Sequence, residues 1–444
     1  MWGSFKEKLR KIQKEDLLKE SIAPFILKIS GLVLGYLFTY FASKKYGAEV
    51  WGAFSLITTI TLFCSYIFKL GFDTALLKFA AEYNTQGKLG ALWGVYLKMI
   101  KIAIPLSIIA TFSILLKSHE IAINIFKNSS LEPFLFYGSL AILPNVMIFI
   151  NSEGLRGLGR IKEYVFLQSV GLYMFSILLF FLFVFLGAKT SLIIMQIYLI
   201  SNIITFIISA YWWHKKIFKS IAHPGLSITD IFKVSFPMLW SNIMFVIIGW
   251  TDTLMLGILS TEQTVGVYNI CLKTSFIVIL PLLIINGIIG PQFASYYSNN
   301  DLFNLKKSAL NSSRLIFLLT IPIFCAIVIF PKFILGIFGQ EFTSGISILL
   351  FLCLGQFINA LCGSTDIFLQ MTGNERFFRN VIITATSINI ILNIILIPLY
   401  AGLGSAIASL ISLAFWNIIS VVYIKKKFNI NMIFIPFVKK TIVV

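Results

Sequence analysis

Two carboxylates lie within long apolar stretches of this chain, where an ionisable side chain is costly and tends to face a cavity or a partner. Asp252 falls in the final third of the apolar run 234–257, and Asp366 falls near the end of the run 344–370. A protein that couples transport to an ion gradient needs an acceptor for a proton or a sodium ion, so we predict both as ion-coupling residues. The alternative interpretations pair Asp252 with Lys273 as a packing contact and let Asp366 reach the membrane surface.

Three lysines stand where an ammonium could meet a phosphate group. Lys28 lies within the first apolar run and shares one helical face with Gly31 and Gly35. Lys69 and Lys78 lie near the inner end of the second run. We predict all three as substrate-binding residues for an anionic head group. In the alternative interpretation, each long side chain carries its charge to the lipid head groups, and the glycines allow close helix packing.

Two amides, Asn242 and Asn393, also lie within apolar runs. We predict that they bind sugar hydroxyls, the alternative being hydrogen bonds between helices. The nucleotide-binding pattern Gly-x4-Gly-Lys-Ser/Thr does not occur. The five cysteines lack metal-ligand spacing, and the three histidines lie in predicted loops. The sequence therefore predicts no catalytic residue, no metal site and no cofactor.

The composition of the chain determines which elements must position these residues. Of 444 residues, 58% are hydrophobic and 12% charged, and the mean hydropathy is +0.90. Such a chain needs lipid as its solvent, and its apolar runs of about 20 residues predict spanning helices rather than strands. We therefore predict an all-α integral membrane protein with about twelve spans. They are 22–43, 50–70, 98–117, 131–151, 164–187, 191–213, 234–257, 265–290, 314–337, 344–370, 380–399 and 402–424.

Positive charge is distributed unevenly between the two sides of these helices. The loops on one side carry only Lys44, Lys45, Lys117, Lys127, Lys189 and Lys332, whereas most Lys and Arg residues lie on the other side. The basic side is predicted to be cytoplasmic and to hold both termini. Anionic lipid head groups attract the same residues, so the net charge of +18 requires no nucleic-acid partner. The predicted parts are a basic segment 1–21, a six-helix half 22–213, a linker 214–233, a second half 234–424 and a basic tail 425–444.

The two halves show a weak internal repeat at an offset of 214 residues. Gly52-Ala-Phe aligns with Gly266-Val-Tyr, and the Phe-Ala pair at Phe79 aligns with the pair at Phe293. Six spans per half is an even number, so both halves have the same orientation in the membrane. We predict a pseudo-two-fold axis along the membrane normal and a central cavity between the halves, as in transporters that work by alternating access.

Several motifs resemble those of a known family. Tyr46-Gly-Ala-Glu-Val-Trp-Gly-Ala-Phe-Ser-Leu56, Asp252-Thr-Leu-Met-Leu-Gly257 and Asn393-Ile-Ile-Leu-Ile-Pro-Leu-Tyr400 are similar to segments of O-antigen and capsule (Wzx-type) polysaccharide flippases. These flippases belong to the multidrug/oligosaccharidyl-lipid/polysaccharide superfamily. The resemblance implies a flippase of the bacterial inner membrane that carries an undecaprenyl-diphosphate-linked oligosaccharide, such as an O-antigen unit of lipopolysaccharide, to the outer leaflet. It also implies proton or sodium coupling, and polymerase and export proteins of the same pathway as partners.

Two rival functions differ from this expectation in testable ways. A cation-coupled multidrug exporter shares the fold but would favour an acidic cavity, whereas Lys28 favours an anionic head group. A membrane-integral polymerase or glycosyltransferase would show a large outer loop with clustered acids or histidines, and the predicted outer loops are short with scattered acids. We therefore expect a transport protein rather than an enzyme.

Overall fold

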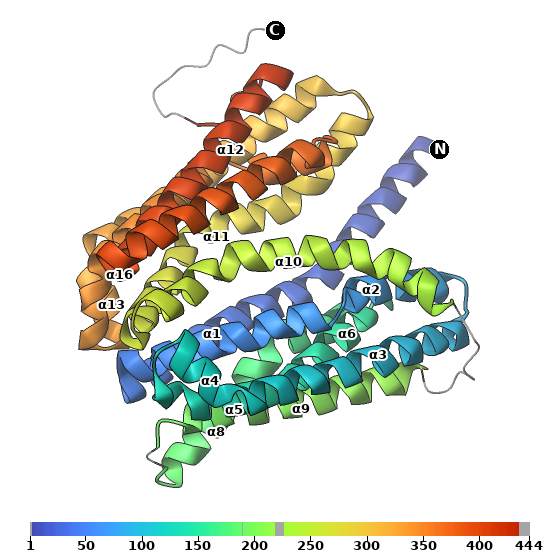
Figure 1. The fold of residues 1–444 in the computed structure, drawn as a ribbon. Helices are drawn as coiled ribbons and strands as arrows, with labels where there is room; N and C mark the ends of the chain where they lie inside the picture. The colour runs from blue at the N-terminus through green and yellow to red at the C-terminus, as the bar shows by residue number, and fades with distance from the viewer. Residues whose placement is uncertain (1, 189, 218–225, 435–444) are drawn as a thin grey trace. The chain divides into compact units, whose positions relative to one another are not determined.

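The computed structural model describes residues 2–188, 190–217 and 226–434, and at 2–22, 241, 242, 244–246 and 248 it describes the backbone alone. These residues form helices, with no strand among them (Figure 1). By its contacts the chain divides into two compact units. Unit 1 comprises Met1–Tyr46 and Leu56–Val246, and unit 2 comprises Gly47–Ser55 and Ile247–Val444.

Unit 1 is built from the following elements, of which α1 and α10 each also contribute residues to unit 2. They are α1 (Trp2–Phe68), α2 (Phe72–Thr85), α3 (Leu89–Leu116), α4 (Ser118–Glu120), η1 (Ile121–Ile125), η2 (Ser129–Leu131), α5 (Glu132–Leu140), α6 (Ile142–Gly157), α7 (Ile161–Val165), η3 (Phe166–Val170), α8 (Gly171–Phe185), α9 (Ile193–Ile217) and α10 (Ile228–Leu259).

Unit 2 continues from the second part of α10. Its further elements are α11 (Glu262–Ser298), α12 (Leu302–Ile329), α13 (Pro331–Phe338), η4 (Gln340–Gly345), α14 (Ile346–Leu361), α15 (Thr365–Met371) and α16 (Glu375–Phe428).

The predicted all-α membrane fold with twelve spans is confirmed. Where side chains are described, nine helices are long and apolar enough to cross a membrane. Two of these, α1 and α16, are each interrupted once and therefore contain two predicted spans. In addition, α10 covers the predicted span 234–257. The two interruptions and α10 raise the number of spans to twelve.

Both interruptions are residues with a positive φ angle. Gly47 divides α1 with φ 79°, a conformation that glycine adopts without steric cost. Ala401 divides α16 with φ 48°. In each case the chain reverses within one residue, so that two predicted spans become a tight hairpin.

Two predicted spans are shorter than expected. The span 314–337 ends at Ile329, because Phe330 leaves the helical conformation and Pro331 begins a new helix. The span 344–370 is interrupted at Gly363, which has φ 68°. Each interruption leaves a short extra helix, α13 and α15 respectively.

Each unit has its own apolar core. The core of unit 1 includes Trp213, Tyr96 and Phe72, and a hydrogen bond of 2.8 Å joins the Tyr96 hydroxyl to Asn151 Oδ1. Unit 2 has a separate cluster that includes Phe293 and Phe368. Buried hydroxyls and amides inside membrane helices need such partners because lipid offers none.

The end of the described chain packs into the core of unit 2. Residues 429–434 lie within the predicted tail 425–444, yet the side chains of Ile430 and Met432 are buried among the apolar cluster of this unit. The ring of Phe434 lies 5.5 Å from that of Phe317 on α12. This segment is therefore part of the folded unit, and the predicted tail contains an ordered, apolar portion.

Candidate functional site

The carboxylate of Asp252 is buried in unit 2 and hydrogen-bonded from three helical segments. The Tyr268 hydroxyl on α11 donates to Oδ2 at 2.7 Å, and Asn393 Nδ2 on α16 donates to Oδ1 at 2.7 Å. The hydroxyl of Ser409, also on α16, donates to Oδ2. A buried charge is costly unless it is hydrogen-bonded, and these three donors offset that cost with uncharged groups.

The break in α16 explains how one helix supplies two of these donors. Asn393 precedes Ala401 by eight residues, and Ser409 follows it by eight. Gly404 lies directly against the backbone carbonyl of Leu396, where a Cβ would not fit. The hairpin is therefore closed tightly enough to bring both side chains to one carboxylate.

A cavity of about 230 Å³, lined by both apolar and polar side chains, adjoins Asp252 within unit 2. Asn393 also donates to Asn389 Oδ1 at 3.0 Å, which continues the network along α16. The polar side chains that line the cavity are Asp252, Gln356, Asn359, Thr386, Asn389, Ser409 and Ser412. Two buried carbonyl oxygens, Gln356 Oε1 and Asn393 Oδ1, have no hydrogen-bond donor among the described residues. Oxygen acceptors beside a carboxylate are the ligands that hard cations prefer.

The second predicted coupling residue, Asp366, has a different environment in unit 2. Asn286 Nδ2 on α11 donates to its two oxygens at 3.1 and 3.3 Å. Asp366 does not line the cavity beside Asp252. The structure therefore separates the two predicted coupling acids into two sites.

Lys69 is held inside unit 1 by a short ion pair. Its ammonium lies 2.6 Å from Asp73 Oδ2, and both side chains are almost fully buried. The same ammonium lies 3.8 Å from the ring centroid of Tyr66, a cation–π contact. These partners already satisfy the charge that we predicted to bind substrate.

Lys28 and Lys78 are both exposed, on α1 and α2 respectively. The glycines beside Lys28 serve packing: Gly31 meets the backbone of Ser169, and Gly35 meets the ring of Tyr173. The side chain of Asn242 lies outside the described residues. The substrate-binding assignments all remain predictions: Lys28, Lys69, Lys78, Asn242 and Asn393.

The segment Gly47–Ser55 of α1 packs against other parts of unit 2, to which it belongs. Glu341 on η4 accepts a hydrogen bond of 2.8 Å from the backbone N–H of Ala48, and Trp51 Nε1 donates to Asn269 Oδ1 at 3.2 Å. Lys273, considered above as a partner of Asp252, has its ammonium 4.7 Å from the ring centroid of Trp51. The alternative Asp252–Lys273 pair is not among the ion pairs of the described residues.

Two glycines make the closest approach in this docking. The backbone of Gly52 lies against the carbonyl of Glu262, and that of Gly266 lies against the carbonyl of Ala48, so that neither position has room for a Cβ. The offset of 214 residues relates Gly52 to Gly266 and Ala48 to Glu262. The contact is therefore reciprocal between equivalent positions of the repeat.

Several site residues had a signal in the sequence that was not used. Asp73 follows Lys69 by four residues, the spacing at which helical side chains pair. Asn389 and Asn393 have the same spacing. Tyr268 lies within the repeat segment Gly266-Val-Tyr, whereas Ser409 lies in none of the quoted motifs, and a hydroxyl alone gives no indication of its partner.

The sequence matches two protein families and is similar to a known probable flippase. The profile of the family described as polysaccharide biosynthesis protein matches residues 17–297, and that of MatE matches residues 237–395. The chain is 25% identical over 421 residues to the probable low-salt glycan biosynthesis flippase Agl15 of Haloferax volcanii, covering 94% of this chain and 85% of that protein.

Solved structures share the fold at low sequence identity. An inward-facing multidrug resistance transporter of the MATE family superposes with a TM-score of 0.77 and 15% identity, covering 92% of this chain and 97% of that one. The lipid II flippase MurJ in an inward closed conformation gives a TM-score of 0.69 and 19% identity, covering 93% and 89%. These likenesses establish a common twelve-helix architecture.

Proposed function

The chain belongs to the polysaccharide biosynthesis protein family, a branch of the multidrug/oligosaccharidyl-lipid/polysaccharide superfamily, and on that premise we propose that it is a flippase for lipid-linked glycans. The substrate is an undecaprenyl-diphosphate-linked oligosaccharide, which moves from the cytoplasmic to the outer leaflet by alternating access. The probable low-salt glycan biosynthesis flippase Agl15, whose similarity extends over most of the chain, supports a flippase of glycan biosynthesis, and the undecaprenyl carrier is our proposal.

The proposed energy source is a gradient of protons or sodium ions. The observation that carries this part of the proposal is the buried Asp252 carboxylate, with its three donors and an adjoining cavity that polar side chains partly line. No ATP-binding pattern is present in the sequence to supply energy instead.

Both ions would change the same contacts. Protonation of Asp252 would turn one of its oxygens from an acceptor into a donor, and the hydroxyls of Tyr268 and Ser409 can rotate to accept it. A sodium ion would bind the carboxylate, and rotation of the Asn393 amide would present an oxygen in place of its Nδ2 donor. Either event rearranges bonds between α10, α11 and α16, and a ligand shifts a conformational equilibrium through such a difference in contacts.

Binding of the substrate is proposed to involve exposed basic residues. Lys28 and Lys78 are exposed on unit 1, and each is available to a diphosphate. Lys69, the third predicted lysine, is paired with Asp73 in this structure, so it would contact the diphosphate only after that buried pair separates.

Translocation in proteoliposomes tests the proposal. A fluorescent undecaprenyl-diphosphate-linked oligosaccharide is placed in the bilayer, and an impermeant quencher reports the fraction in the outer leaflet. We expect translocation that depends on the protein and is accelerated by an imposed proton or sodium gradient. Absence of translocation under every imposed gradient, with protein that is folded and inserted, would reject the flippase function.

Multidrug export is the second candidate, and the MatE match in the second half of the chain favours it. The same vesicles distinguish the two functions. Gradient-driven uptake of an organic cation such as ethidium, without movement of the lipid-linked glycan, would support the exporter instead.

A further inference from the structure

The short helix α13 contributes no residue to the cavity beside Asp252. It follows the break at Phe330 and lies on the side of the membrane that we predict to be outer. One face of the helix is buried through Leu335 and Phe338, whereas Phe333 is 72% exposed. A short amphipathic helix at the end of a span is suited to the interface between head groups and acyl chains.

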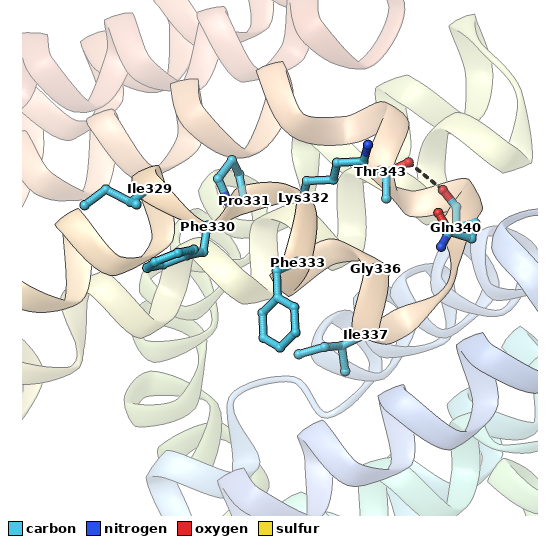
Figure 2. A pocket seen from close by; sticks show the side chains of 9 residues that line it. All are labelled: Ile329, Phe330, Pro331, Lys332, Phe333, Gly336, Ile337, Gln340 and Thr343. Atoms are coloured by element: carbon cyan, nitrogen blue, oxygen red, sulfur yellow. Dashed lines mark hydrogen bonds between the residues drawn. The ribbon is translucent and has the colours of Figure 1, made fainter.

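A groove of about 610 Å³ runs along this helix. Figure 2 shows Phe330, Phe333 and Ile337 along one edge, while the side chain of Lys332 extends toward Thr343 on η4. The lining thus combines an apolar edge with an ammonium and the polar side chains of Gln340 and Thr343. All of the lining residues belong to unit 2.

Lys332 is the charged group of this groove. It forms no ion pair with any side chain that the structure describes. It is also the one Lys or Arg residue predicted in the outer loops of the second half, where positive charge is generally avoided. An exposed ammonium at head-group depth attracts a phosphate, with the apolar edge available for a chain.

We propose that this groove binds an anionic phospholipid of the outer leaflet, with its phosphate on Lys332 and one acyl chain along Phe330, Phe333 and Ile337. The site is distinct from the cavity beside Asp252, and none of its lining residues is shared. Charge complementarity selects the anionic lipid, because the phosphate of a zwitterionic lipid is partly compensated by its own amine.

The groove adjoins η4, so a bound lipid would also affect the contact that η4 makes with α1. Gln340 and Thr343 flank Glu341 on η4, and the Thr343 hydroxyl donates to the Gln340 carbonyl at 2.6 Å. Glu341 in turn accepts the N–H of Ala48. A lipid seated on Lys332 therefore stabilises the turn that anchors the segment Gly47–Ser55 on unit 2.

Lipid retention by the purified full-length protein tests the site. Native mass spectrometry is performed after titration with phosphatidylglycerol, phosphatidylcholine or undecaprenyl phosphate, each as a separate probe. We expect one phosphatidylglycerol to be retained in preference to phosphatidylcholine, and Lys332→Ala to weaken that binding about fivefold, as for one lysine near a lipid surface. Lys332→Arg should restore it. The matched control is Lys127→Ala, another exposed lysine of the predicted outer loops, which should leave it unchanged.

A second variant tests the apolar edge without altering charge. Phe333→Ala removes a ring that is mostly exposed, so the fold is retained while binding of phosphatidylglycerol falls. Equal retention of both phospholipids, or Lys332→Ala binding like the unaltered protein, would overturn the proposal. Lys332-dependent binding of undecaprenyl phosphate alone would overturn the choice of occupant.

Discussion

Asp252 is the side chain whose charge state can alter contacts with α11 and with both arms of α16, since Tyr268, Asn393 and Ser409 all donate to it. An isosteric amide keeps the volume but replaces one acceptor oxygen with a donor. It also removes the negative charge that attracts a cation. Replacement of Asp252 by asparagine therefore tests ion coupling while keeping the volume of the side chain.

We expect Asp252→Asn to abolish acceleration by an ion gradient, lowering gradient-driven translocation about tenfold or more while slow equilibration between leaflets persists. The measurement is the proteoliposome assay with and without the gradient. Asp366→Asn tests the other predicted coupling acid in the same assay, since Asp366 is half-buried and has a separate amide partner. If the asparagine variant at 252 responds to the gradient like the unaltered protein, the coupling role of Asp252 is wrong.

Lys28 is predicted to meet the anionic head group, and its exposure on α1 leaves it available. Replacement by Ala should lower translocation about tenfold, the scale of one charge-assisted hydrogen bond, without reducing the amount of protein in the membrane. Arg should restore activity at least in part because the charge is kept. Full activity of the Ala variant would assign Lys28 to the lipid surface.

At the scale of elements, the packing of Gly47–Ser55 within unit 2 depends on close contact between the backbones of α1 and α11. Gly266→Ala inserts a methyl group against the carbonyl of Ala48, where the neighbour is backbone and cannot rotate away. We expect a loss of stability of about 1–3 kcal/mol, typical of overpacking, together with impaired transport. The thermal midpoint in detergent provides the measurement.

The control for this change lies on the same helix. Gly287 on α11 has open space where its Cβ would be, so Gly287→Ala should be neutral or slightly stabilising. An equal loss at both positions would indicate a general intolerance of α11 rather than a specific contact.

The C-terminal segment contributes to the core of unit 2 through Met432, which is fully buried. Met432→Ala should cost about 2–5 kcal/mol, the range for deleting a large buried side chain. Met371→Ala, at a methionine that is 37% exposed, should have a small effect. Thermal unfolding of the two variants measures the difference, and equal midpoints would contradict the role of this segment.

At the scale of the whole molecule, charge bias predicts both termini and the basic loops in the cytoplasm. In a variant without the native cysteines, a single cysteine at position 127 should react with an impermeant thiol reagent on intact cells, and one at position 307 should not. Labelling in the opposite pattern would invert the orientation and, with it, the predicted outer position of Lys332.

Hydropathy was sufficient to predict the spans, because a run of apolar residues has one stable form in lipid. Hydropathy did not predict where the helices are interrupted within these spans. Pro331 and Gly363 each ended a helix that the hydropathy continued, since hydropathy does not register backbone geometry. Ile430 and Met432 were assigned to a basic tail because the apolar run that begins at Met432 is too short to span a membrane and lies between two groups of lysines.

For the candidate site, too, the sequence predicted some residues and missed others. Asp252 and Asp366 were predicted as coupling residues because an acid in an apolar run is conspicuous. Their partners were not, because hydroxyls and amides are common in membrane helices and only the fold selects which of them meet. Lys69 was predicted to bind substrate, whereas the structure supplies Asp73 as its partner one turn away.

The reciprocal contact of Gly52 with Glu262 and Gly266 with Ala48 also has an evolutionary meaning. In a symmetric homodimer, a residue i that touches j on the partner implies that j touches i, and the contact contains the two-fold axis. An ancestral protein of six helices could make this contact with a second copy of itself. Gene fusion would then preserve the interface inside one chain, and the small residue would be required twice because the symmetry requires it twice.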